Sequence, residues 1–150
     1  AKIIVVGRDY IKLSLFTFAN ETYLDTDLPK QLAVDHAFEC TGGQGCEEAI
    51  NQIISTIRPE GCIMLIGVSE TKVPILTRDV LEKGLTLVGC SRSGRQDFEK
   101  AVQVLSQSSV QNRMKLIISQ VKDIHCVSDI NAAFEADINN PYKTVLKWQV

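Results

Sequence analysis

The sequence has no excess of positive charge and no long apolar run. Among its 150 residues, 16 are basic and 18 are acidic, so the formal net charge is -2. A chain without a basic field is a poor candidate for wrapping nucleic acid. No apolar stretch approaches the roughly 20 residues that a membrane-spanning helix needs, and the apolar start of the chain is too short for a signal peptide. We therefore expect a soluble cytoplasmic protein that binds neither nucleic acid nor a membrane.

The chain also lacks the local signatures of metal binding, hydrolysis and phosphoryl transfer. Its five cysteines are odd in number and widely spread, no C-x-x-C pair occurs, and the two histidines lie far apart. A disulfide framework and a structural zinc site are therefore not expected. There is no G-x-S-x-G segment and no Gly-rich lysine loop. Hydrolytic and kinase-like chemistry are disfavoured.

What the sequence does contain is an alternation of short apolar runs and longer amphipathic stretches. Hydrophobic residues make up 45% of the chain, enough for one core. The alternation is typical of parallel strands covered by helices on both faces, so we predict an α/β fold. Strands are predicted at residues 3–6, 36–40, 63–66 and 85–88.

Helices are predicted between and after these strands. The first carries Ala49, Ile50, Ile53, Ile54 and Ile57 at helical spacing, and residues 59–61 end it. The second runs from about Thr77 to a stop at Gly84. The third places Phe98, Ala101, Val102 and Leu105 on one face, with Asp97 as a cap.

The last part of the chain has a different pattern. Residues 116–118 predict a strand, and residues 144–148 alternate like a half-exposed strand. Between them, Ser128 is a candidate cap for a helix. That helix is expected to bury Ile130, Ala133, Phe134 and Ile138.

Each of the first four strands ends in glycine or reaches one within two residues. These glycines are Gly7, Gly42, Gly67 and Gly89. Ligands of open α/β sheets bind outside the carboxyl ends of strands, where glycine lets the backbone turn sharply and approach a bound molecule. The four positions together predict one shared crevice, although each glycine alone is also explained as a strand terminator.

A dinucleotide-binding G-x-G-x-x-G turn is absent. Residues 43–48 come nearest to it, but they lack the third glycine and place Glu47 and Glu48 where a pyrophosphate would lie, so we predict an ordinary turn. Gly7, Arg8 and Lys12 follow the first strand. If this is the second strand of a nucleotide-binding fold, an arginine in place of an acidic residue favours NADP over NAD. The alternative is a solvated loop arginine, and the adjacent Asp9 counts against an anion site.

Several motifs resemble the cofactor-binding half of the medium-chain dehydrogenase/reductase superfamily, of the zinc alcohol dehydrogenase type. They are residues 35–43, residues 57–61 leading into 65–68, and residues 85–89. More narrowly, residues 67–70, 81–87, 91–94, 133–137 and 143–148 resemble the ribulose-5-phosphate reductases, also called ribitol-5-phosphate dehydrogenases, of bacterial teichoic acid and capsule synthesis. This likeness covers nearly the whole chain.

The resemblance implies a Rossmann-like, doubly wound, mostly parallel sheet that lacks its first strand and the G-x-G-x-x-G turn at the N-terminus. It implies a partial NADP-binding domain at residues 1–115 and a tail at 116–150 that packs on the catalytic domain. In the family order 3-2-1-4-5-6 the missing strand is central. Residues 3–6 could move into its place, a neighbouring chain could fill it, or the first thirty-odd residues could pack differently. Zinc ligands are expected only in the missing half.

Position by position, the resemblance implies three groups of NADP-binding residues. Gly7, Arg8 and Lys12 are expected around the adenosine 2′-phosphate. Cys40, Thr41 and Gly42 are expected beside the ribose and nicotinamide. The nicotinamide carboxamide is expected to meet Ile66, Gly67 and Val68 on one strand end and Cys90, Ser91 and Arg92 on the next.

The function implied is that of a fragment of an NADP-dependent oxidoreductase. It would transfer hydride between nicotinamide and a sugar phosphate, ribulose 5-phosphate, with zinc polarising the carbonyl in the complete enzyme. The fragment alone would be inactive, and the family's usual state is a homodimer. Two alternatives stay open: another zinc-dependent alcohol or polyol dehydrogenase, and a non-catalytic nucleotide-binding regulatory domain.

Overall fold

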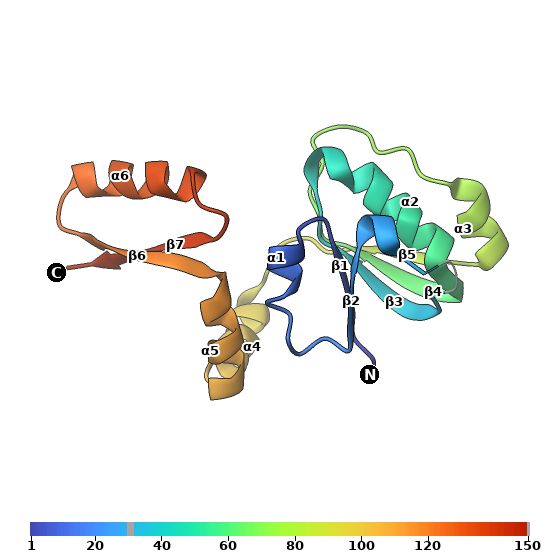
Figure 1. Cartoon of the computed structure of the whole chain (residues 1–150), viewed down its shortest axis with the longest axis horizontal. Helices are drawn as coiled ribbons and strands as arrows, with labels where there is room; N and C mark the ends of the chain where they lie inside the picture. Colours follow the sequence, from blue (N-terminus) through green and yellow to red (C-terminus); the bar gives the residue numbers. More distant parts are fainter. Residues whose placement is uncertain (30–31, 150) are drawn as a thin grey trace. The chain divides into compact units, whose positions relative to one another are not determined.

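The computed structural model describes residues 1–29 and 32–149 and divides into two units, Ala1–Arg92 and Ser93–Val150. The first unit contains two separate parallel sheets, and the second contains one parallel strand pair (Figure 1). None of the helices within the described ranges has the length and apolar character that crossing a bilayer requires. The predicted division after residue 115 concerns packing on a domain outside this chain and stays a prediction.

The first sheet is a parallel pair formed by β1 (Ile4–Gly7) and β2 (Glu21–Leu24). A short helix, α1 (Tyr10–Leu13), follows β1. Asp9 caps this helix, because its side chain accepts hydrogen bonds from two backbone N–H groups of the first turn at 2.8 and 3.1 Å. Such caps satisfy N–H groups that a helix leaves unbonded. The carboxylate next to Arg8 therefore serves the helix.

The second sheet has the strand order β3-β4-β5. Its parallel strands are β3 (Val34–Glu39), β4 (Ile57–Leu65) and β5 (Thr86–Gly89). Helix α2 (Cys46–Thr56) connects the first two strands, and α3 (Thr77–Lys83) precedes the third. The predicted strand-helix alternation is confirmed, as is the helix stop at Gly84, which takes the left-handed conformation with φ of 61°.

The core of this unit lies between α2 and the second sheet. Ile50 and Ile54, four residues apart, share one face of α2. They pack with Ile57 and Ile63 of β4, and Cys46 completes the buried cluster. Figure 1 shows α2 running over strands β3 to β5. The β-branched residues of the sequence pattern thus form the contact between helix and sheet.

The boundary between α2 and β4 differs from the prediction. The helix ends at Thr56, and Ile57 is already extended, so the strand begins six residues earlier than expected. Its pairing with β3 is irregular between Val34 and His36. Residues 58–61 form this irregular part, in which Glu60 has a φ of 62°. Pro59 disfavours helical geometry at the residue before it, which explains the early helix end.

The two sheets are not joined by hydrogen bonds. Within the described ranges β1 pairs only with β2, and β3 pairs only with β4. The possibility that residues 3–6 move beside residues 36–40 is therefore wrong for this structure. The prediction that residues 36–40 are buried on both faces is also wrong, because Phe38 is 65% exposed on the face opposite to Ala37, which packs against the buried cluster with α2.

The second unit begins with two helices, α4 (Arg95–Leu105) and α5 (Ser108–Met114). It continues with the parallel strands β6 (Ile118–Ile124) and β7 (Lys143–Trp148), connected by α6 (Val127–Ile138). Asp97 stabilises the start of α4 as predicted, since its carboxylate accepts the backbone N–H of Gly94 at 2.8 Å.

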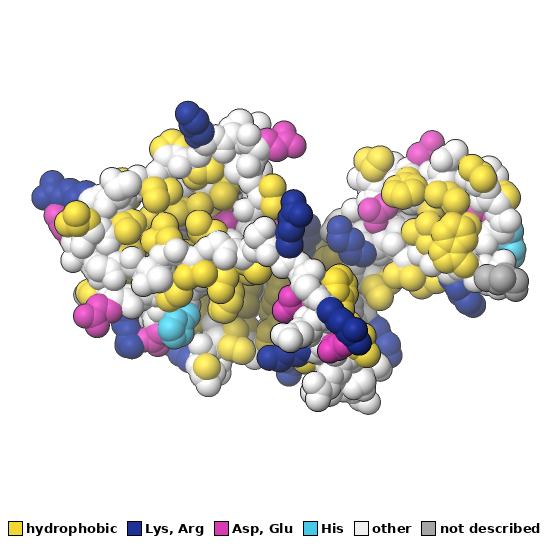
Figure 2. Space-filling view, turned by 180° about the vertical axis from the view of Figure 1, so that it is seen from behind, with side chains coloured by type: hydrophobic (Ala, Val, Ile, Leu, Met, Phe, Trp, Pro, Cys, Tyr) yellow, Lys and Arg dark blue, Asp and Glu magenta, His cyan; other side chains and the backbone are white. Residues whose placement is uncertain are grey.

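Three predictions for this second unit need correction. Residues 115–117 form a 3-10 helix, so the strand begins only at Ile118. Asp129, rather than Ser128, stabilises the start of α6 by accepting the backbone N–H groups of His125 and Cys126. On α6 only Ala133 is buried, whereas Phe134 and Ile138 are exposed. Figure 2 shows hydrophobic side chains gathered on the face of this unit that the view presents.

Candidate functional site

Three turns follow the carboxyl ends of the strands of the second sheet. Because β3, β4 and β5 are parallel, these turns lie at one edge of the sheet. The backbone N–H groups of Ile66 and Gly67 donate to the carbonyl of Glu39 at 2.9 and 3.0 Å, and Gly43 N–H donates to the carbonyl of Val68 at 2.8 Å. The structure therefore brings residues 40–42 and 66–68 together.

The third predicted group, residues 90–92 after β5, is connected to the neighbouring strand end by one backbone hydrogen bond. The backbone N–H of Cys90 donates to the carbonyl of Leu65 at 3.3 Å, which places the end of β5 beside the end of β4. Cys90, Ser91 and Arg92 are all exposed, and Arg92 has a φ of 57°. These residues lie at the same edge of the sheet as the other two turns.

Glu39 is a residue of this edge that sequence reasoning did not assign a role. It is the last residue of β3 and only 1% exposed. Its Oε1 accepts the backbone N–H of Thr41 at 2.6 Å and that of Gly42 at 3.2 Å, and its Oε2 accepts the N–H of Gly67 at 3.1 Å. An acidic residue inside an apolar run was the available signal, because a buried carboxylate requires hydrogen-bond partners.

Two glycines are required by the geometry around this carboxylate. Gly42 has a φ of 65°, which L side chains rarely adopt. A Cβ on Gly67 would lie 2.5 Å from Oε2 of Glu39 and 2.5 Å from the backbone nitrogen of Gly42. The geometry of these turns therefore requires both glycines, in addition to their role in ending the strands.

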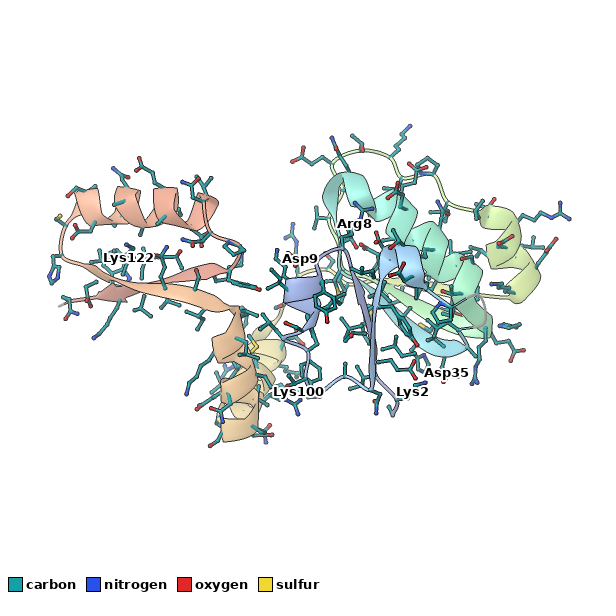
Figure 3. All side chains as sticks on the ribbon, in the orientation of Figure 1. Lys2, Arg8, Asp9, Asp35, Lys100 and Lys122 are labelled. Atoms are coloured by element: carbon teal, nitrogen blue, oxygen red, sulfur yellow. The ribbon has the colours of Figure 1, made fainter. Side chains whose placement is uncertain are left out.

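Arg8 extends from the end of β1 and pairs with acidic side chains from two other segments. Its Nε donates to Asp25 at 2.9 Å, in the 3-10 turn after β2, and a terminal nitrogen donates to Glu48 of α2. The hydrogen bond to Asp25, followed by the charge of Glu48, raises the pKa of Arg8 above its ordinary value. Figure 3 shows Arg8 at the end of β1 and Asp9 at the adjoining start of α1.

A cavity of about 1010 Å³ lies between β1 and β3. Five of the predicted binding residues line it: Gly7, Arg8, Lys12, Cys40 and Thr41. It also contacts α2 at residues such as Glu48 and Gln52. The residues that line it do not include Gly42, the turn after β4 or the turn after β5. The cavity thus joins the predicted adenosine side to the first part of the predicted nicotinamide side.

Two thiols beside Glu39, and the possible metal ligands among the described residues, bear on nucleophilic and metal chemistry. Burial, followed by the charge of Glu39, raises the pKa of both the Cys40 and the Cys46 thiol, so both stay protonated at neutral pH. In the described ranges no three histidine, cysteine or acidic side chains are grouped so that they could hold a metal ion. These residues do not fit the zinc that the predicted family would carry, and no zinc-dependent step is assigned to them.

Comparison with known proteins agrees with this geometry. The α/β units with parallel strands and glycine turns are of the Rossmann-like class. A family model described as zinc-binding dehydrogenase matches residues 18–107. The match spans more than half of the chain, and the chain belongs to the zinc-binding dehydrogenase family. The resemblance drawn from the sequence motifs is confirmed at this level.

Two curated relatives are similar to this chain over nearly its whole length. The chain is 51% identical over 150 residues to a ribulose-5-phosphate reductase of Streptococcus pneumoniae, covering 100% of this chain and 43% of that protein. It is 47% identical to ribulose-5-phosphate reductase 1 of Staphylococcus aureus, covering 99% of this chain and 44% of the relative. The chain therefore spans less than half the length of these curated relatives.

Solved structures show the same fold. The crystal structure of S. aureus TarJ in complex with NADPH superposes with a TM-score of 0.96 at 45% identity, covering 100% of this chain and 48% of that chain. L-idonate 5-dehydrogenase of Escherichia coli gives a TM-score of 0.77 at 19% identity, covering 97% of this chain and 42% of that chain, and shows the fold alone. The predicted Rossmann-like fold is confirmed.

Proposed function

We propose that the chain is the NADPH-binding part of a longer reductase that converts the ketone of ribulose 5-phosphate to the alcohol of ribitol 5-phosphate. The observation that carries the proposal is the position of Arg8 directly after Gly7, at the end of β1 and on the wall of the cavity. The 45% identity to S. aureus TarJ, a protein solved with NADPH, supports it. When bound, the cofactor supplies the hydride that the carbonyl carbon receives.

At the adenosine end, Arg8 and Lys12 are the groups that would hold the 2′-phosphate. A planar guanidinium binds phosphate through two parallel hydrogen bonds, and a second cation adds charge. Gly7 stands where an NAD-binding fold carries an acidic residue, so no carboxylate occupies that one position. Asp25 and Glu48 each accept one hydrogen bond from Arg8 and hold it in place. An arginine has five N–H donors, more than these two acceptors require.

At the nicotinamide end, the three turns of the second sheet would present backbone groups to the cofactor. Residues 40–42 would lie beside the ribose and nicotinamide. Residues 66–68 and 90–92 would meet the carboxamide. The left-handed Gly42 and the close approach at Gly67 fit such a site, because both let the backbone come near a flat ring. The division of roles among these turns rests on the family resemblance.

The remaining assignments concern the longer protein. We propose a cytoplasmic homodimer whose sugar-phosphate substrate is held mainly by residues outside this chain. No described residue of this chain is assigned to the sugar phosphate. The chain's own part in the reaction is to bind and orient the cofactor.

The test uses the longer reductase and the variant Arg8→Asp. Ribulose 5-phosphate reduction is measured with NADPH and with NADH by following cofactor oxidation. Loss of a charge-assisted hydrogen bond costs about 2 kcal/mol, so kcat/KM with NADPH should fall about 30-fold or more, and with NADH by much less. Arg78→Asp is the matched control, since Arg78 forms an exposed ion pair with Glu82, one turn along α3.

Equal losses with both cofactors would contradict the assignment of Arg8 to the 2′-phosphate. Binding of NADPH without turnover of ribulose 5-phosphate, but with turnover of another polyol or ketone, would favour a related dehydrogenase. Binding without any turnover would favour a regulatory nucleotide-binding domain.

A further inference from the structure

A single buried carboxylate connects the two turns that lie at the end of β3 and the end of β4. Glu39 is 1% exposed, yet all three of its backbone donors belong to turn residues: Thr41, Gly42 and Gly67. Thr41 and Gly42 are in its own turn. Gly67 is 28 residues away in the turn after the neighbouring strand. The side chain therefore joins the two turns.

The chemistry at this position favours a role tied to those donors. Removing a carboxylate from water is unfavourable unless hydrogen bonds replace the lost hydration. Hydrogen bonds from backbone N–H groups to a charged acceptor are short and strong, and the 2.6 Å distance from Thr41 is of that kind. An apolar side chain would be easier to bury at the end of a strand. A carboxylate here is explained by the turns that it holds.

The backbone around the carboxylate is built to its dimensions. A Cβ on Gly67 would stand 2.5 Å from Oε2 and 2.7 Å from Oε1 of Glu39, so only glycine lets the turn approach this closely. A Cβ on Gly42 would lie 3.0 Å from the carbonyl oxygen of Val68. The carbonyl of Glu39 also accepts the N–H groups of Ile66 and Gly67. Both the main chain and the side chain of Glu39 thus bind the second turn.

We propose that Glu39 is a positioning residue for the nicotinamide end of the cofactor. Its carboxylate sets the separation of residues 40–42 and 66–68, and with it the placement of the backbone groups that face the nicotinamide. Glu39 acts through these turns, because its own side chain is occupied by their amides and by the thiol of Cys46. The inference rests on the proposed function.

A merely structural role predicts a different result from a positioning role. Loss of stability weakens the binding of every cofactor fragment to a similar extent. A positioning role at the nicotinamide end weakens NADPH binding while adenosine 2′,5′-bisphosphate, which lacks nicotinamide, binds as before. Arg8 follows β1 of the other sheet and Lys12 lies in α1, so the fragment reports on the unaltered adenosine side.

The experiment measures the dissociation constants of NADPH and adenosine 2′,5′-bisphosphate for the longer reductase and for Glu39→Gln. Glutamine keeps the size of the side chain but replaces one acceptor with an N–H group that opposes a backbone N–H. We expect NADPH to bind about tenfold more weakly, from the loss of about one charge-assisted hydrogen bond, and the fragment to bind within about twofold of wild type. Glu82→Gln, on the exposed surface of α3, is the matched control and should leave both constants unchanged.

A second variant covers the case in which Glu39→Gln fails to fold. Glu39→Asp keeps the charge and can still reach its own turn, but its shorter side chain withdraws from Gly67, so it should show the same selective loss. Equal weakening of both ligands, or no change in either, would overturn the inference. A wild-type protein that binds neither ligand would instead refute the proposed function.

Discussion

Lys83 caps the C-terminal end of helix α2, and its replacement tests how much this contact stabilises the helix. It is the last residue of α3, and its ammonium group donates to the carbonyls of Ile54 at 2.7 Å, Ser55 at 2.8 Å and Ile57 at 3.1 Å. These carbonyls belong to the last turn of α2 and to the residue that follows it, where a helix leaves its acceptors unbonded. Replacing Lys83 with methionine keeps the length of the apolar stem and removes all three bonds.

The expected loss follows from the number and kind of these bonds. A hydrogen bond to a charged group contributes about 1.5–3 kcal/mol, and the favourable charge at a helix C-terminus adds about 0.3–1 kcal/mol. The three bonds share one partly exposed ammonium group, so their contributions do not add in full, and water can replace some of them. We expect Lys83→Met to destabilise α2 by about 2 kcal/mol.

Hydrogen exchange detected by mass spectrometry measures this effect within the longer protein. A loss of about 2 kcal/mol in opening free energy speeds exchange about 30-fold for peptides that cover Cys46–Thr56. Lys72→Met, in the exposed loop before α3, is the control and should leave α2 unchanged. If Lys83→Met and Lys72→Met gave the same exchange in α2, the capping role of Lys83 would be refuted.

Two further predictions concern the core of the first unit and the pH dependence of the second unit. Ile63 is fully buried and is aligned with Ala37 and Leu87 on the neighbouring strands. Ile63→Ala should therefore lower the free energy of unfolding of the first unit by about 3–4 kcal/mol, measured by chemical unfolding. Leu81→Ala, at the exposed surface, is the control and should change this free energy little. The N–H groups of His125 and Cys126 hold the pKa of Asp129 below its ordinary value of 3.8. The ionised carboxylate therefore stabilises α6 fully above pH 3.8, and this stabilisation is lost as the pH falls through the pKa of the folded state. Asp129→Asn should therefore speed exchange at the start of α6 at pH 7, and the difference from wild type should shrink as the pH falls below 3.8; a difference that does not change with pH would contradict the reasoning.

The parts of the fold that depend on local patterns were predictable from the sequence. The isoleucine spacing of α2 and the glycine stop at Gly84 lie within single elements, and both agree with the structure. The start of β4 was less accurate, because the geometry of residues 58–61 depends on the pairing with β3. The exposure of Phe134 was missed because burial depends on what packs against a helix face as well as on its periodicity.

In the candidate site, too, local features were predictable and contacts between distant residues were not. Strand-end glycines and the arginine after Gly7 were visible in the sequence. The partners of Arg8 were not, since Asp25 and Glu48 are 17 and 40 residues away along the chain. The role of Glu39 depends on Gly67 coming within hydrogen-bond distance across two strands. Such contacts depend on which strands pair and in which register, and a local sequence pattern does not reveal this.

The proposed function requires that the turns after successive parallel strands converge on one NADPH molecule, with Arg8 at its adenosine end. A crystal structure of the longer protein with NADPH bound tests this most directly. We expect a 2′-phosphate oxygen within hydrogen-bond distance of the Arg8 guanidinium, and a nicotinamide ring against residues 40–42 and 66–68. A cofactor bound at another edge of the sheets, or a 2′-phosphate that contacts neither Arg8 nor Lys12, would contradict it.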